Sequence, residues 1–203
     1  MNSAELQLIV LAADAGATTN GLEPAHAPAA AATTPWQIAL VNGVPLLPLM
    51  LSRATAVAGH SVTVVLGANA RELSPALGRL PVTLVVDRHW EEGIAASIRA
   101  GLLALTGSCG GALLLHAAQS GVTSADLQRL VDLWRRNPRT IVAAQCGGGH
   151  DLPAIFPRSE FPALLRLRGS QGARTLLRNP GAALAGVQMP GALAIAGHEV
   201  VAA

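Results

Sequence analysis

Residues 6–13 of the chain read LQLIVLAA, a near-continuous run of apolar side chains. A run of this length without alternation is typical of a β-strand that is covered on both faces, as strands are in parallel sheets. Residues 14–35 follow with the aperiodic sequence DAGATTNGLEPAHAPAAAATTP. We predict that this segment is a loop, mobile or ordered by a partner, and its place directly after the strand makes it a candidate binding loop.

Outward from this segment, apolar runs of strand length alternate with helical patterns. Further strands are predicted at residues 61–66, 82–86, 112–115, 141–144 and 184–189. Helices are predicted at residues 45–59, 93–105, 161–167 and 171–178. A further short helix is predicted to end near Gly78, and another to begin at Thr123 or Ser124 and end before Asn137-Pro138. This alternation predicts an α/β fold, a mainly parallel, Rossmann-like, doubly wound sheet with helices on both faces. We expect one domain over residues 1–203.

The composition favours a folded chain and excludes several functions. Hydrophobic residues make up 51% of the 203 residues, so the chain can bury a large core. All 14 basic residues are arginine, which excludes Schiff-base chemistry and a lysine clamp on a triphosphate. Nucleic-acid binding is not indicated, because the net charge is only +2 and aromatic residues make up 2% of the chain. No basic cluster in the sequence is longer than Arg135-Arg136.

Membrane and disulfide frameworks are not indicated either. No apolar run reaches the ~18 residues needed to span a bilayer, and the first residues lack a basic leader region. The two cysteines, Cys109 and Cys146, do not make a disulfide framework. We expect a soluble, cytoplasmic protein that binds neither membrane nor nucleic acid.

Short motifs occur in a characteristic order along the chain. They are NGVPLL at residues 42–47, VVLG at 64–67, WEEGIAASIRAGL at 90–102, VT running into Leu127 at 122–127, and LPAIFP at 152–157 with GSQGAR at 169–174. In this order they resemble the MobA/MocA-like nucleotidyltransferases, which attach CMP or GMP to molybdopterin during maturation of the molybdenum cofactor. The resemblance covers nearly the whole chain and implies the fold of nucleotide-diphospho-sugar transferases.

The phosphate-binding side of the family's site is altered in this sequence. Family members continue the first strand into a loop of the form LAAGxSxRMG and then a lysine, which together hold the triphosphate. Here the strand end is kept, but Asp14 stands at the first glycine, Thr18 at the arginine and about Trp36 at the lysine. The resemblance therefore leaves a residual nucleotide-binding set. Its members are Ala12, Ala13, Asp14, Gly16, Asp87 and Ser97.

The metal-binding side is altered as well. The family holds magnesium with an aspartate in a DQP-like turn, where this chain has Ala118. Ala194 and Ala196 stand at the acidic places of a DIDTP-like motif, and Ser170 at the aspartate of a GDxGAR-like turn. Motifs that shape the fold match while the charged groups are missing, so we predict no catalytic residue, no metal ligand and no cofactor.

Several residues allow two interpretations. Asp87 is either a residual metal ligand or hydrogen-bond acceptor, where the family has an asparagine near the nucleotide, or a solvated carboxylate at a strand end. Arg99 either reaches an anion or lies on the surface. Trp36 could fill the volume that a nucleotide would use, whereas Trp134 is predicted to pack in the core.

A transition-metal site is the other open interpretation. Its candidate ligands are His116, Cys146, His150 and Asp151. They lack a metal-motif spacing, and the alternative is a buried cysteine followed by a flexible loop over the glycine run at residues 147–149.

The preferred hypothesis is a MobA/MocA-like protein that has lost catalysis and serves as a binding or assembly partner. Its partner would be a protein, a second copy or a pterin-type ligand. The alternative is an active CTP- or GTP-dependent molybdopterin nucleotidyltransferase with displaced residues. Asp14, Asp87 and Asp151 would then hold magnesium, and Arg99 or Arg174 would meet the phosphates. A third possibility is that a partner chain supplies the missing residues.

Overall fold

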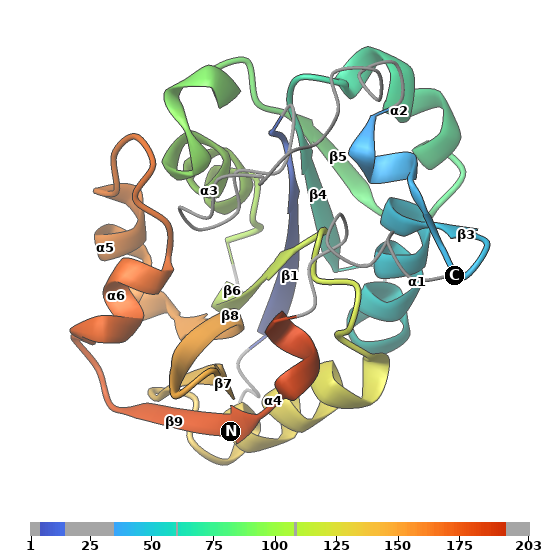
Figure 1. Cartoon of the computed structure of the whole chain (residues 1–203). Helices are drawn as coiled ribbons and strands as arrows, with labels where there is room; N and C mark the ends of the chain where they lie inside the picture. Colours follow the sequence, from blue (N-terminus) through green and yellow to red (C-terminus); the bar gives the residue numbers. More distant parts are fainter. Residues whose placement is uncertain (1–4, 15–34, 60, 108, 194–203) are drawn as a thin grey trace.

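The computed structural model describes residues 5–14, 35–59, 61–107 and 109–193, which form a central sheet covered by helices (Figure 1). The sheet has seven strands in the order β5-β4-β1-β6-β8-β7-β9. Their bounds are Glu5–Ala12 (β1), Val62–Leu66 (β4), Thr83–Val86 (β5), Cys109–His116 (β6), Ile141–Cys146 (β7), Gly149–Pro157 (β8) and Leu184–Gln188 (β9). Neighbouring strands pair in parallel except at β8, which is antiparallel to β6 and β7. The predicted mainly parallel α/β sheet is confirmed.

Both faces of the sheet are covered because the central strand is apolar on both. Leu8 and Val10 of β1 belong to the core that contains α1 (Leu46–Ala58), α2 (Ala70–Leu77) and α4 (Ser124–Arg136). Ile9 and Leu11 belong to the opposite core, with α3 (Ile94–Leu103), α5 (Phe161–Leu165) and α6 (Arg174–Arg178). The unbroken apolar run is thus divided between two helical layers by the alternation of side chains along a strand.

Short elements connect these layers. They are the 3₁₀ helices η2 (Trp36–Ile38), η3 (Trp90–Glu92), η4 (Arg158–Glu160) and η5 (Pro190–Leu193), and the two-stranded sheet of β2 (Leu40–Val41) and β3 (Val44–Pro45). The predicted cap of α4 is confirmed, because Thr123 and Asp126 form a reciprocal capping box. Trp134 lies on the inner face of α4 and is 1% exposed, as predicted.

The chain order creates a topological switch point between β1 and β6. From β1 the chain moves outward to β4 and β5, and it then returns to place β6 on the other side of β1. Leu11 near the end of β1 is in register with His116 at the end of β6. Ligands of open parallel sheets bind at the carboxyl ends of the strands at such a point, so the residues that follow β1 and end β6 define the candidate site.

Strand β8 was not predicted, and the expected flexible loop over residues 147–149 is wrong. Gly147 and Gly148 have φ values of 55° and 78°, and they join Cys146 of β7 to its partner Gly149 in β8. Positive φ at both residues of a two-residue connection is typical of a tight type I′ hairpin turn. The glycine run therefore forms the turn that allows β8 to pair antiparallel to β7.

Other boundaries differ in length, and part of the chain lies outside the described residues. Strand β6 is longer than the predicted 112–115, and α5 and α6 are shorter than 161–167 and 171–178. Gly169, with a φ of 56°, lies between these two helices. Residues 15–34 of the predicted binding loop lie outside the part of the chain that the structure describes. Ala194 and Ala196 lie outside it as well.

The hairpin turn can be tested by two matched substitutions. Gly148→Ala places a Cβ on a residue with a positive φ, which we expect to lower the free energy of unfolding by about 1–2 kcal/mol. Gly149→Ala is the control, because its φ is not positive and an added Cβ meets nothing within 4 Å. Equal unfolding free energies of the two variants, measured by urea titration, would contradict the turn.

The capping box of α4 predicts a dependence of stability on pH. Burial opposes ionisation of Asp126, but hydrogen bonds from Thr123 and the ion pair with Arg129 outweigh it and hold the pKa of this carboxyl below its ordinary value of 3.8. A carboxyl whose pKa is lower in the folded state stabilises the fold above the unfolded pKa and loses this contribution as the pH falls. We expect Asp126→Asn to lower the unfolding free energy by about 0.3–1 kcal/mol at pH 7 and to have a progressively smaller effect below pH 3.8. Asp132→Asn, on the exposed side of the same helix, is the control for charge removal. An Asp126→Asn effect that does not change with pH would exclude this role of the carboxylate.

Candidate functional site

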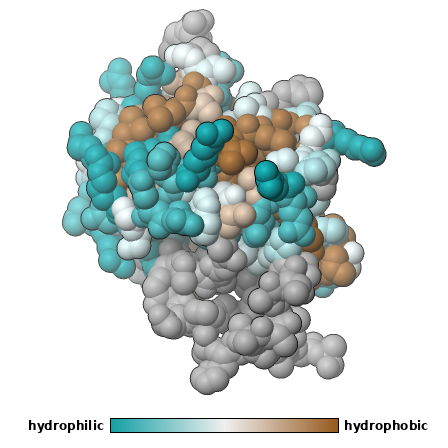
Figure 2. Space-filling model, turned by 90° about the horizontal axis from the view of Figure 1, so that it is seen from above, coloured by the Kyte–Doolittle hydropathy of each residue, from teal (hydrophilic) through white to brown (hydrophobic). Residues whose placement is uncertain are grey.

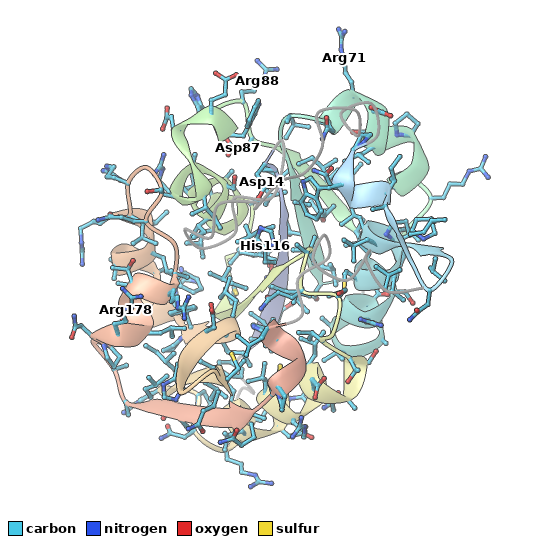
Figure 3. The ribbon with its side chains drawn as sticks, in the orientation of Figure 1. Asp14, Arg71, Asp87, Arg88, His116 and Arg178 are labelled. Atoms are coloured by element: carbon cyan, nitrogen blue, oxygen red, sulfur yellow. The ribbon has the colours of Figure 1, made fainter. Side chains whose placement is uncertain are left out.

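Asp14 and His116 form a pair across the switch point. Asp14 follows the end of β1, His116 is the last residue of β6, and the Asp14 Oδ2 atom lies 3.3 Å from His116 Nε2. Figure 3 shows Asp14 directly above His116. The histidine side chain is 9% exposed and the aspartate side chain 32%, so the pair closes the junction of the two strands while the carboxylate still reaches the surface.

The hydrogen bonds of His116 indicate its tautomer. The backbone N–H of Ala118 donates to His116 Nδ1 over 3.2 Å, so Nδ1 is an acceptor and carries no proton. The imidazole proton is then on Nε2, where it is donated to the Asp14 carboxylate. His116 therefore acts as a neutral donor that orients Asp14.

Trp36 and Gln37, both in η2, contact the end of β1 and the His116 ring. The rings of Trp36 and His116 are stacked with centroids 5.9 Å apart and an angle of 10° between the planes. The Trp36 indole N–H donates to the Asp14 carbonyl, and the buried Gln37 amide donates to the carbonyls of Ala12 and Asp14. Asn69 in turn donates to Gln37 Oε1. The Trp36 ring covers His116.

One oxygen of this cluster has no partner. Asp14 Oδ1 is shielded from solvent and accepts no hydrogen bond from the residues that the structure describes. Leaving a buried acceptor without a donor costs about 1–3 kcal/mol. This unpaired oxygen distinguishes Asp14 from Asp87 at the same edge of the sheet, because both oxygens of Asp87 accept hydrogen bonds.

Asp87 and Ser97 form a second buried pair. Ser97 Oγ of α3 donates to Asp87 Oδ2 over 2.9 Å, and the backbone N–H of His89 donates to Asp87 Oδ1 over 2.9 Å. Both residues are 4% exposed. The interpretation of Asp87 as a solvated carboxylate is therefore wrong. Oδ2 joins the end of β5 to α3, and Oδ1 fixes the turn that follows β5.

The remaining members of the predicted nucleotide-binding set are backbone positions. Ala12 and Ala13 are buried, and the Ala13 carbonyl accepts from Ala68, which joins β1 to the residues after β4. Gly16 lies outside the described residues. The structure thus brings Ala12, Ala13 and Asp14 together with His116, and it places Asp87 and Ser97 in a separate pair.

The arginines that were considered for phosphate binding are engaged within the protein. Arg99 donates to the Leu167 carbonyl over 2.9 Å and to Glu92 over 3.1 Å. Arg174 lies 3.5 Å from Asp151. The family's triphosphate would have to compete with these contacts.

The transition-metal interpretation gains no support from the geometry of the described ranges. Within them, no three His, Cys, Asp or Glu side chains gather into a group that could hold a metal ion. Burial, and then the charge of Asp151, raises the pKa of the Cys146 thiol against the opposing effect of Arg174. A thiol that stays protonated is a poor metal ligand and a poor nucleophile.

A family model described as a MobA-like NTP transferase domain matches residues 34–186, well over half of the chain. The chain belongs to the MobA-like NTP transferase family. This confirms the resemblance seen in the sequence motifs. The match begins after β1 and after the segment where members of the family carry their phosphate-binding loop.

Solved structures share the fold over most of their length. Rv0371c from Mycobacterium tuberculosis H37Rv aligns with a TM-score of 0.74 and 22% identity, over 93% of this chain and 90% of that chain. A nucleotidyl transferase from Methanothermobacter has a TM-score of 0.69 and 20% identity, over 91% and 87% of the two chains. Molybdopterin-guanine dinucleotide biosynthesis protein A from Archaeoglobus fulgidus has a TM-score of 0.62 and 14% identity, over 90% and 83%. No curated protein sequence matches. Identities this low establish the shared fold alone.

The residues at the switch point do not fit a magnesium-bound triphosphate. By the resemblance of the sequence motifs, the carboxylate of Asp14 falls where family members present backbone amides to phosphates, and like charges repel more strongly away from bulk water. Ala118, which is buried, offers no side-chain oxygen where the family has its magnesium aspartate. By the same motif resemblance, this chain has a negative group, Asp14, in place of the phosphate amides and Ala118 in place of the magnesium aspartate.

Sequence reasoning missed Gln37 and Asn69, which orient the end of β1. Both are amides in segments with no periodic pattern or motif of their own. Their role depends on contacts to Ala12, Asp14 and each other, so no local signal could have identified them.

Of the described helices, none is both long and apolar enough to cross a bilayer.

The Asp87–Ser97 pair can be tested by stability measurements. Ser97→Ala removes the donor to a buried carboxylate oxygen, and we expect the unfolding free energy to fall by about 1–3 kcal/mol. Ser52→Ala on the exposed side of α1 is the matched control and should change it by less than about 0.5 kcal/mol. The same small effect for both variants in chemical denaturation would show that the Ser97 hydrogen bond is not important for the fold.

Proposed function

We propose that this protein is a MobA-like NTP transferase-fold protein that has lost nucleotidyl transfer and works as a binding or assembly partner, in molybdenum cofactor maturation. The observation that carries the proposal is the Asp14–His116 pair at the switch point. Its support is that the sequence motifs align the negatively charged Asp14 with the position that the family uses for phosphate.

The surrounding residues support the loss of catalysis. Nucleotidyl transfer builds charge on the reacting phosphate and needs cationic groups and a metal at that position. Arg99 and Arg174 have partners within the protein. Asp14, Asp87 and Asp151 contact different residues and do not form a group of three metal ligands within the described ranges.

A role in assembly agrees with the surface. Figure 2 shows apolar side chains interrupting the polar surface on the face seen from above. Leu40 and Val44, in the β2–β3 hairpin, are 62% and 43% exposed, and Val86 at the end of β5 is 52% exposed. Exposed apolar side chains of this kind are available for contact with another molecule. A protein partner, a second copy or a pterin-type ligand would fit this role.

The alternative is an active CTP- or GTP-dependent molybdopterin nucleotidyltransferase. One of the similar structures is described as a nucleotidyl transferase and another as a molybdopterin-guanine dinucleotide biosynthesis protein. For this chain, such an activity would require Asp14 to release His116 and take a metal. A partner chain that supplies the missing groups would give the same activity in the complex.

Thermal unfolding with nucleotides tests the proposal. We expect neither CTP nor GTP, with magnesium, to raise the melting temperature above that with magnesium alone. A surviving site saturated at ~100 times its dissociation constant would add about 2.7 kcal/mol of stability. With molybdopterin added, we expect no dinucleotide product, because losses of several charged groups in one site leave turnover undetectable.

Two outcomes would overturn the proposal. A magnesium-dependent stabilisation by CTP or GTP would show that the nucleotide site survives and would favour the active transferase. Dinucleotide formation only by material that is purified with its native partner would show that the partner completes the site.

A further inference from the structure

The charge at the switch point determines which ligands it can take. Among the described residues, the charged or titratable side chain that contacts the Asp14 carboxylate is His116. His116 is held as a neutral donor by the Ala118 N–H, so it supplies one hydrogen bond and no positive charge. The negative charge of Asp14 is therefore not compensated by these contacts.

The carboxylate also has unused hydrogen-bonding capacity. Asp14 Oδ2 faces His116, whereas Oδ1 accepts no hydrogen bond from any described part of the chain although it is shielded from solvent. A carboxylate with two acceptor oxygens pairs best with a planar group that presents two adjacent N–H donors. The 32% exposure of the Asp14 side chain leaves an approach to the carboxylate from the surface.

An aromatic surface lies next to the carboxylate. Trp36 is partly exposed, stacks on His116 and donates its indole N–H to the Asp14 backbone. Planar cations such as amidinium and guanidinium groups interact favourably with the faces of aromatic rings, and tryptophan gives the strongest of these interactions. A carboxylate and an indole held together at a switch point are thus suited to a planar cation.

We infer that the Asp14–Trp36 corner binds a small planar ligand with an amidinium- or guanidinium-type edge, in place of the phosphate that the fold otherwise takes at this position. The inference rests on the proposed function, because it uses the same end of β1 as a binding site. The ligand's two N–H groups pair with the carboxylate of Asp14, which turns from its present orientation to bring the shielded Oδ1 to the ligand. Its plane lies against Trp36.

Three probes of one shape test the inference on the wild-type protein. They are benzamidine, which is cationic, benzamide, which is neutral, and benzoate, which is anionic. We expect calorimetric titration to show binding of benzamidine, at least tenfold weaker binding of benzamide, and no binding of benzoate. Equal binding of the three probes, or preference for benzoate, would overturn the inference.

Matched variants locate the site. Asp14→Asn keeps the shape of the side chain and removes its charge, and we expect it to weaken benzamidine binding at least tenfold. Asp132→Asn removes an exposed carboxylate of α4 and should leave the affinity unchanged. Trp36→Leu should weaken binding, and Trp36→Phe should retain most of it. If Asp14→Asn binds benzamidine as the wild type does, the inference is wrong.

The results separate this inference from the proposed function. Stabilisation by CTP or GTP with magnesium contradicts the loss of catalysis whatever benzamidine does. Absence of binding by both nucleotides and benzamidine contradicts the cation site and leaves the loss of catalysis in place. If Asp14→Asn does not fold, the probe series and the Trp36 variants still decide.

Discussion

The burial of both faces of β1 is the constraint on which the other parts of this structure depend. From Leu8 to Ala13, every side chain is at most 4% exposed. A strand of this kind needs a helical layer on each side and paired strands on both edges, because its backbone groups must all be hydrogen-bonded away from water. The parallel neighbours β4 and β6 meet this need and bring their carboxyl ends to the same edge of the sheet.

That arrangement makes the end of β1 the most constrained position of the candidate site. Backbone carbonyls of Ala12, Ala13 and Asp14 accept from Gln37, Ala68 and Trp36. The carboxylate of Asp14 is thereby held at the junction of β1 and β6, beside His116. Ligands of open parallel sheets bind at this edge, so Asp14 places a negative charge at the position where such a ligand would lie.

The predictable part of the fold follows from local physical signals. The unbroken apolar run of β1, the helical spacing in α4 and its cap at Thr123 are all read over a few neighbouring residues. Composition alone does not predict the hairpin of β7 and β8, although Gly147 and Gly148 form its turn. Consecutive glycines are compatible with a flexible loop and with a tight turn, and only the pairing of the flanking strands distinguishes the two.

By itself, the sequence determined the layered α/β architecture, the family motifs and the absence of lysine and of the family's acidic residues. Tertiary structure alone decided what the remaining polar groups do. Asp14 meets His116 102 residues away in sequence, and Asp87 meets Ser97 on another element. The periodicity of apolar side chains is a property of neighbouring residues, and it indicates which side of a helix or strand faces the core. A hydrogen bond between two strand ends depends on the register and order of strands, which form only when the whole sheet is assembled.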